Sequence, residues 1–150
     1  MASAWPISSV ELVYVILCDD VRLEVGNKLT LVGVFSTLLV PHLPVTILKF
    51  AVVHHWRGEG EYLSEVRVLS PDRSHAIAAS HPASFSIPPG GYADNVTIFA
   101  NVTFPVTGTY TVQTFLNSML VHEYPLPVGL LSEDEGRRFP LGPPTGNRIH

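Results

Sequence analysis

The stretch that decides the fold runs from Leu12 to Val40 and reads LVYVILCDDVRLEVGNKLTLVGVFSTLLV. Its two apolar runs are rich in Val, Leu, Ile, Tyr and Phe, and they are separated by an acidic break at Asp19 and Asp20 and by a turn at Gly26-Asn27. Residues of these types fit a pleated, half-buried surface better than they fit a helix. The stretch therefore predicts a strand, a short alternating crossing and a long strand, with the turn supplying the positive φ of a tight reversal.

Strand-like segments continue along the chain. The apolar runs Leu12 to Cys18 and Thr46 to Val53 do not alternate, so they predict strands buried on both faces. Asn95 to Phe104 alternates cleanly and predicts a strand with one face in water. Further strands are expected at residues 62–69, 76–87, 111–116 and 119–128, a polar loop at 57–61, and a strand end at 88–91.

About eight strands at spacings of roughly ten residues, without an amphipathic helix, are typical of an antiparallel β-sandwich of immunoglobulin-like or C2-like type. A closed barrel is the alternative. The segment Gly108-Thr109-Tyr110 resembles the corner at which such sandwiches bury a tyrosine, so we expect the Tyr110 hydroxyl to bond to backbone.

Three regions follow from these patterns: an N-terminal arm over residues 1–9, a sandwich domain over 10–128, and a Pro/Gly-rich C-terminal tail over 129–150. In the tail, Phe139 and Leu141 are the expected apolar anchors, and Arg137 and Arg138 are the expected interaction residues beside them. The sequence leaves open whether the tail docks on its own domain or on another copy.

Composition limits the function. The formal net charge is −4, and the basic residues are scattered, which argues against nucleic acid as a partner. One cysteine excludes an intrachain disulfide. No uninterrupted apolar run reaches the roughly 18 residues of a membrane helix, and no secretory leader is visible, so we expect a cytoplasmic location and no membrane insertion.

The acidic residues, the histidines and the cysteine are all better explained by structural roles than by chemistry. Asp19 and Asp20 have too few neighbouring oxygens for calcium, which takes roughly six to eight, so a solvated turn is favoured over a cation site. The seven histidines match no zinc spacing, and Cys18 ends an apolar strand, where a small hydrophobe is favoured over a nucleophile. We therefore expect no catalytic, metal or cofactor residues, and a protein that is not an enzyme.

Three aromatic residues carry an alternative. Trp56, Tyr62 and Tyr92 lie in or beside expected rim loops, where they would stack on a carbohydrate or a peptide. Packing at the ends of the core is the favoured interpretation, because large aromatic residues at strand ends usually close a core.

The motifs ILCDDVR (Ile16–Arg22) and GNKLTLVGVF (Gly26–Phe35), followed by Leu43-Pro44, resemble a family of small bacterial proteins of unknown function. The hairpin from Gly108 to Val128 also looks like the end of that family. The resemblance covers about Val10 to Val128 and implies a compact sandwich, with no catalytic or cofactor residues to carry over. The tail lies outside it.

The sequence leads to one expectation about function. With 46% hydrophobic and only 15% charged residues, part of the apolar surface is expected to be covered by a partner. We expect a non-enzymatic structural or assembly protein that self-associates as a dimer, ring or filament, or joins a larger protein assembly, through strand edges and its tail. The alternative is a ligand-binding module for carbohydrate or peptide.

Overall fold

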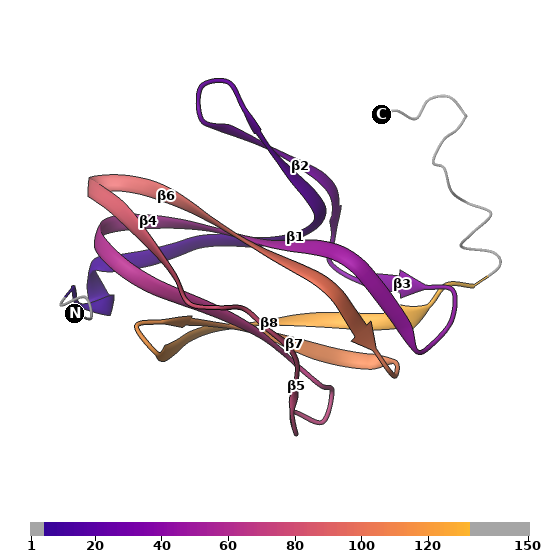
Figure 1. The fold of residues 1–150 in the computed structure, drawn as a ribbon. Helices are drawn as coiled ribbons and strands as arrows, with labels where there is room; N and C mark the ends of the chain where they lie inside the picture. The colour runs from indigo at the N-terminus through magenta and orange to yellow at the C-terminus, as the bar shows by residue number, and fades with distance from the viewer. Residues whose placement is uncertain (1–4, 133–150) are drawn as a thin grey trace.

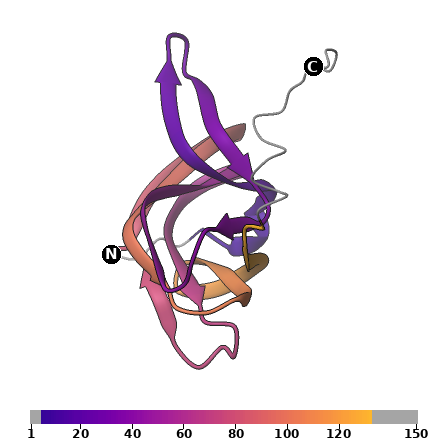
Figure 2. The same ribbon diagram turned by 90° about the vertical axis from the view of Figure 1, so that its right-hand side faces the viewer.

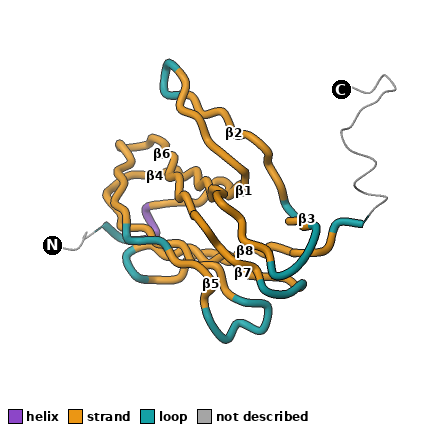
Figure 3. Tube along the Cα trace, turned by 45° about the vertical axis from the view of Figure 1, so that its right-hand side comes forward, coloured by secondary structure: helices purple, strands orange, loops and turns teal. Residues whose placement is uncertain are grey.

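The computed structural model describes residues 5–132, and these are almost entirely β-strand (Figures 1 and 3). The predicted all-β class is confirmed. One short helical turn, η1 (Ile7–Ser9), precedes the strands. The strands are β1 (Val10–Glu24), β2 (Lys28–Phe35), β3 (Leu38–Val40), β4 (Val45–Leu69), β5 (Ala76–Ala79), β6 (Ala83–Phe104), β7 (Gly108–Leu116) and β8 (Met119–Leu130).

All eight strands belong to one mixed sheet. The order is β2-β1-β4-β7-β8-β3, and β5 and β6 also pair with β4. The prediction of an antiparallel arrangement is wrong at one place, because β3 runs parallel to β8, with Leu38 opposite Val128. A pattern of apolar residues marks a strand but does not name its neighbour, so this pairing was invisible in the sequence.

Strand β4 is the centre of the sheet. The first half of β4 pairs with β1 on one side and with β6 on the other. The second half pairs with β7 on one side, and with the beginning of β6 and then β5 on the other. The expected loop at residues 57–61 is part of the strand. Gly58 and Gly60 have φ values of 142° and 117° and mark a register shift, so the strand bends here without losing its partners.

The bend places the core between the two halves of the sheet. Leu17 and Phe50 from the first half pack in one cluster with Val66, Val112 and Leu126 from the second half. Figure 2 shows the strands curling around this interior. Residues 50–53 are buried, so the predicted burial of β4 on both faces is confirmed there, but it is wrong over residues 46–49, where Leu48 is 75% exposed.

The acidic break and the proline-rich break do not end strands. β1 is continuous through Asp19 and Asp20, and β6 is continuous through residues 88–91. Burial of β1 on both faces is also wrong in part, because Val13 and Tyr14 are exposed. Strand pairing satisfies the backbone whatever the side chain, so polar or proline residues at an outer face or edge are tolerated.

The hairpin of β1 and β2 projects from the rest of the molecule (Figures 1 and 2). Val21, Leu29 and Leu31 pack against a small cluster on the sheet formed by the buried residues Cys18, Ala51 and Val53. At the tip, Val25 is 92% exposed and Leu23 is 73% exposed. The hairpin therefore covers part of the sheet and leaves apolar side chains in solvent.

Two predicted turns are confirmed. Tyr110 is fully buried, and its hydroxyl donates to the Val106 carbonyl at 2.7 Å, which is the expected tyrosine corner. Asn117 and Ser118 have φ values of 50° and 69° between β7 and β8, as a two-residue hairpin turn requires. Within residues 5–132, no helix has the length and apolar character needed to cross a membrane.

Candidate functional site

One edge of the sheet has no neighbouring strand over much of its length. Along Gly91–Phe104, β6 pairs with β4 on one side, and no strand within residues 5–132 pairs with it on the other. An unpaired edge presents N–H and C=O groups to any extended chain that reaches it. Residues 96–102 contain no charged residue and no proline, which are two of the usual protections of an edge, but the backbone is irregular at Asn101, whose φ is 55°, so the regular part of this edge is residues 96–100. This edge is open to strand addition.

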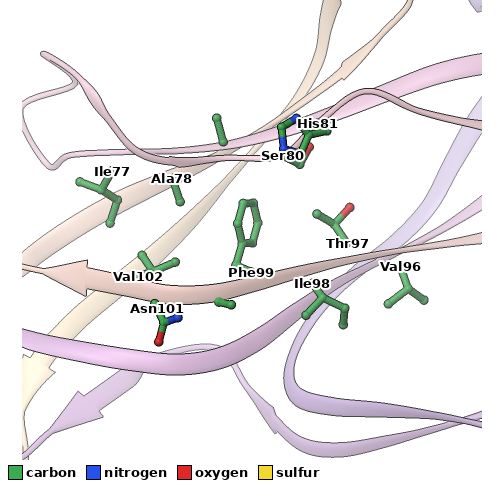
Figure 4. A pocket seen from close by; sticks show the side chains of 12 residues that line it. Ile77, Ala78, Ser80, His81, Val96, Thr97, Ile98, Phe99, Asn101 and Val102 are labelled. Atoms are coloured by element: carbon green, nitrogen blue, oxygen red, sulfur yellow. The ribbon is translucent and has the colours of Figure 1, made fainter.

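A groove of about 430 Å³ lies along this edge. Its walls are residues 77–81, from β5 and the segment after it, and residues 96–102 of β6 (Figure 4). Both β5 and β6 pair with the same side of β4. Because β4 bends between these two pairings, β5 and the end of β6 face each other across the groove. The volume is within the range of about 300–1,000 Å³ that ligand pockets occupy.

The lining of the groove is apolar at its base and polar at its rim. Phe99 is buried, and Ile77 and Ala78 pack against the same core, so these walls are fixed to the interior. The amide of Ser80 donates to the Val66 carbonyl, and the Ser80 hydroxyl accepts from the Val66 amide, both at 2.8 Å. The groove is therefore a built feature of the fold with a firm wall.

A second surface feature, the aromatic patch, crosses three strands of the outer face. Tyr14 of β1, His55 of β4 and Tyr92 of β6 stack with ring centroids 4.8 and 5.1 Å apart. The three rings are nearly parallel, with interplanar angles of 12° and 13°. Tyr92 is 54% exposed and Tyr14 is also exposed, so the two ends of the stack face solvent.

Polar groups fix the aromatic patch. His55 Nδ1 lies 2.6 Å from Asp94 Oδ1, and Arg57 bonds to Glu11. The Glu11 carboxylate, and then the Tyr92 hydroxyl, raise the pKa of Arg57. These contacts hold the rings in position for stacking on a planar group or a sugar face, with carboxylate and phenol groups beside them as hydrogen-bonding partners.

His54 points the other way, into the core, and is fully buried. Its Nε2 lies 2.6 Å from the Thr114 hydroxyl, and its ring stacks on Trp56 at a centroid distance of 5.6 Å. Burial, and then the charge of His122, lower the pKa of His54 to about 4. The residue is therefore a neutral part of the core near pH 7, which fits a structural role.

The predicted rim residues separate into two groups. Trp56 and Tyr62 are buried in a cluster with Leu116, so they are core residues and cannot present their rings to a ligand. The Tyr62 hydroxyl donates to the Glu59 carbonyl at 2.6 Å. Tyr92 alone of the three is exposed. The expected tail residues, Arg137, Arg138, Phe139 and Leu141, lie outside the described residues.

The candidate reactive groups behave as structural residues. Cys18 is buried, and burial raises the pKa of its thiol. Asp20 bonds to the Val21 amide and pairs with Lys49 at 2.9 Å, and these contacts lower the pKa of its carboxyl. Asp19 lies against Gly33. Within residues 5–132, no three His, Cys, Asp or Glu side chains converge as a metal site would require.

Sequence reasoning missed two members of the aromatic patch. Tyr14 belongs to a strand that the sequence predicts to be buried on both faces, whereas its ring is exposed. His55 lies 39 positions before its partner Asp94, so no local pattern connects the two residues. The alternation of β4 did indicate that His54 and His55 face opposite sides. Only the pairing of β4 with β1 and β6 shows which side holds the tyrosines.

Comparison with solved structures shows the fold but not the activity. The alkylpurine DNA glycosylase AlkC of Pseudomonas fluorescens, solved bound to DNA containing an abasic site analogue, is similar over 81% of this chain, with a TM-score of 0.52 and 6% identity. The match spans 30% of the glycosylase chain. At this identity the likeness concerns the architecture alone, and one architecture serves many functions.

Comparison with sequences places the chain in a family. None of the curated proteins matches it. A family model described as a family of unknown function, DUF6941, matches residues 13–129. This range covers every strand from β2 to β7 and most of β1 and β8. The chain therefore belongs to the DUF6941 family of unknown function.

Proposed function

We propose that the chain is a non-enzymatic assembly protein that self-associates through a strand edge and its C-terminal tail. The observation that carries this proposal is the unpaired, uncharged edge of β6, which borders a groove of about 430 Å³. Edge strands of folded proteins are normally blunted by charge, proline or a cover, because an open edge pairs with other chains. An open edge beside a groove fits a binding role.

Two further features support an assembly role. The tip of the β1–β2 hairpin exposes Leu23 and Val25, and Val34 and Ile98 are exposed on opposite edge strands of the same outer face. Only 15% of the residues are charged. Exposed apolar side chains on a surface with few charges mark contacts with other protein molecules.

Light scattering of the full chain and of a chain ending at Ser132 tests this proposal. We expect the full chain to form a dimer or larger species at micromolar concentration and the shortened chain to be a monomer. If both chains are monomers, self-association is wrong. If both have the same larger mass, the tail has no part in assembly.

The aromatic patch favours a second candidate function, a ligand-binding module for carbohydrate or peptide. Tyr92 and Tyr14 offer exposed ring faces, and Asp94 lies beside them. A thermal shift measured on a panel of glycans tests it. Stabilisation by one glycan that is lost in Tyr92→Ala supports this function, and no stabilisation by any glycan contradicts binding of carbohydrate.

The immunoglobulin-like or C2-like type of sandwich, the bacterial origin of the family and the cytoplasmic location stay predictions. They agree with an assembly protein but do not decide its partner.

A further inference from the structure

We propose that the groove between β5 and β6 binds the segment Arg137–Leu141 of a second copy as an added β-strand. This inference rests on the proposed self-association and names the two surfaces that meet. The groove is bounded by residues 77–81 on one wall and 96–102 on the other. Because it is walled on both sides, it admits one extended segment rather than the edge of another folded sheet.

The sequence of the segment suits an edge strand. Phe139 and Leu141 are two positions apart, so in a strand their side chains share one face and would both reach the apolar base formed by Phe99 and Ile77. Pro140 favours an extended conformation at Phe139.

The position of Pro140 also fixes which side of the segment pairs. In a strand, alternate residues direct their N–H and C=O groups to opposite neighbours. If residues 139 and 141 bond to β6, the missing N–H of Pro140 faces away from β6, where no ladder is needed. The segment can therefore add to one edge but cannot become a central strand, so each groove takes a single added strand.

The length of the tail and the charge of the segment suit docking in a groove of this kind. Phe139 lies seven positions beyond Ser132, a reach of about 23 Å in an extended chain. Residues 136–150 contain three arginines and no acidic residue, whereas residues 5–132 contain ten acidic and six basic residues. The segment and the sheet thus carry opposite net charge, which favours their encounter and makes it weaker at high salt.

Substitutions in the full chain test the two surfaces separately. Ala79→Glu places a charge in the groove wall at an exposed position of β5, and Phe139→Ala with Leu141→Ala removes the anchors without touching the sheet. Ala83→Glu is the matched control, because Ala83 is an exposed alanine of β6 outside the groove. We expect the first two changes to convert the assembled species to monomer and the control to keep the wild-type mass.

Disulfide trapping tests whether the contact joins two copies. A chain with Ala79→Cys is mixed with a chain with Leu141→Cys under oxidising conditions, and Ala83→Cys replaces Ala79→Cys in the control mixture. Native Cys18 is buried and does not compete. We expect a disulfide-linked pair of different chains in the first mixture, at least ten times the yield of the control.

The outcomes separate this inference from the proposed function. If the wild type is itself a monomer, self-association fails and this inference fails with it. If the wild type assembles, the chain ending at Ser132 does not, and Ala79→Glu leaves the mass unchanged, the proposed function stands and the groove is the wrong surface. A cross-link that forms only within one chain, in a variant carrying both cysteines, shows docking on the same copy and overturns the inference.

Discussion

Replacing His54 by glutamine is expected to remove most of the loss of stability between pH 7.5 and pH 5. Folded His54 takes up a proton at a pKa of about 4, whereas an unfolded histidine does so near 6.5. As the pH falls, the unfolded state therefore binds the proton first, and stability is lost from pH 6.5 down to pH 4. Above this pH range the imidazole of His54 is neutral in both the folded and the unfolded protein, so it does not make stability depend on pH.

The magnitude follows from the two pKa values. At pH 5 the unfolded histidine is almost fully charged and the folded one is mostly neutral, which lowers the free energy of unfolding by about 2 kcal/mol relative to pH 7.5. The loss reaches about 3 kcal/mol near pH 4. Glutamine cannot titrate, and its amide still reaches the Thr114 hydroxyl that His54 Nε2 contacts at 2.6 Å.

The assay is urea unfolding of the wild type, His54→Gln and His55→Gln at pH 7.5, 6 and 5. His55 is adjacent in sequence but lies on the outer face beside Asp94, so His55→Gln is the matched control that removes a histidine from the same strand without changing the buried site. Hydrogen bonds from Ser70 and Ser74 lower the pKa of Asp72 to about 2. The stability that this carboxylate contributes is lost only below about pH 4, so measurements that stop at pH 5 do not include it. An equal loss of stability in wild type and His54→Gln would refute the assignment to His54.

Two further changes test the packing of the fold. Tyr110→Phe removes the hydrogen bond from the buried tyrosine to the carbonyl of Val106, which is itself exposed, and should lower the free energy of unfolding by about 0.5–1.5 kcal/mol in urea at pH 7.5; no change would show that the corner does not contribute to stability. Gly33→Ala should cost more than Gly26→Ala in the same assay, since both have positive φ but only at Gly33 would the added Cβ meet a side chain, that of Asp19, which would have to move. We expect about 1–2 kcal/mol for the backbone conformation at either site and a further loss at Gly33, and equal costs would contradict the close approach.

Strand propensity and turn chemistry made the fold class predictable. The turn at Gly26-Asn27 and the hairpin at Asn117-Ser118 lie where their residue types place them, and the Tyr110 corner forms as its neighbours predict. These features depend on residues close together in the chain, so local patterns are enough to find them.

The breaks between strands were less predictable. Strand β4 continues through residues 57–61 and β6 through residues 88–91, because pairing resumes on either side of the bend, at Gly58 with Gly91 and at Gly60 with Ile87, and residues 88–90 of β6 form the bulge between these pairs. The polar residues and glycines predicted a loop at 57–61 and a strand end at 88–91, and both predictions are wrong, because an irregularity within a long strand and a loop between two strands look alike in sequence.

For the candidate site, the sequence determined the composition of the tail and the apolar strands, and for Tyr92 it favoured packing at the end of the core, whereas the structure exposes that residue. Tertiary structure alone decided that Trp56 and Tyr62 are core residues, that Tyr14 and His55 join Tyr92, and that β5 and β6 border a groove. The physical reason is that a side chain's face is set by local periodicity, whereas its neighbours are set by strand order and by the bend of β4, which depend on contacts between distant parts of the chain.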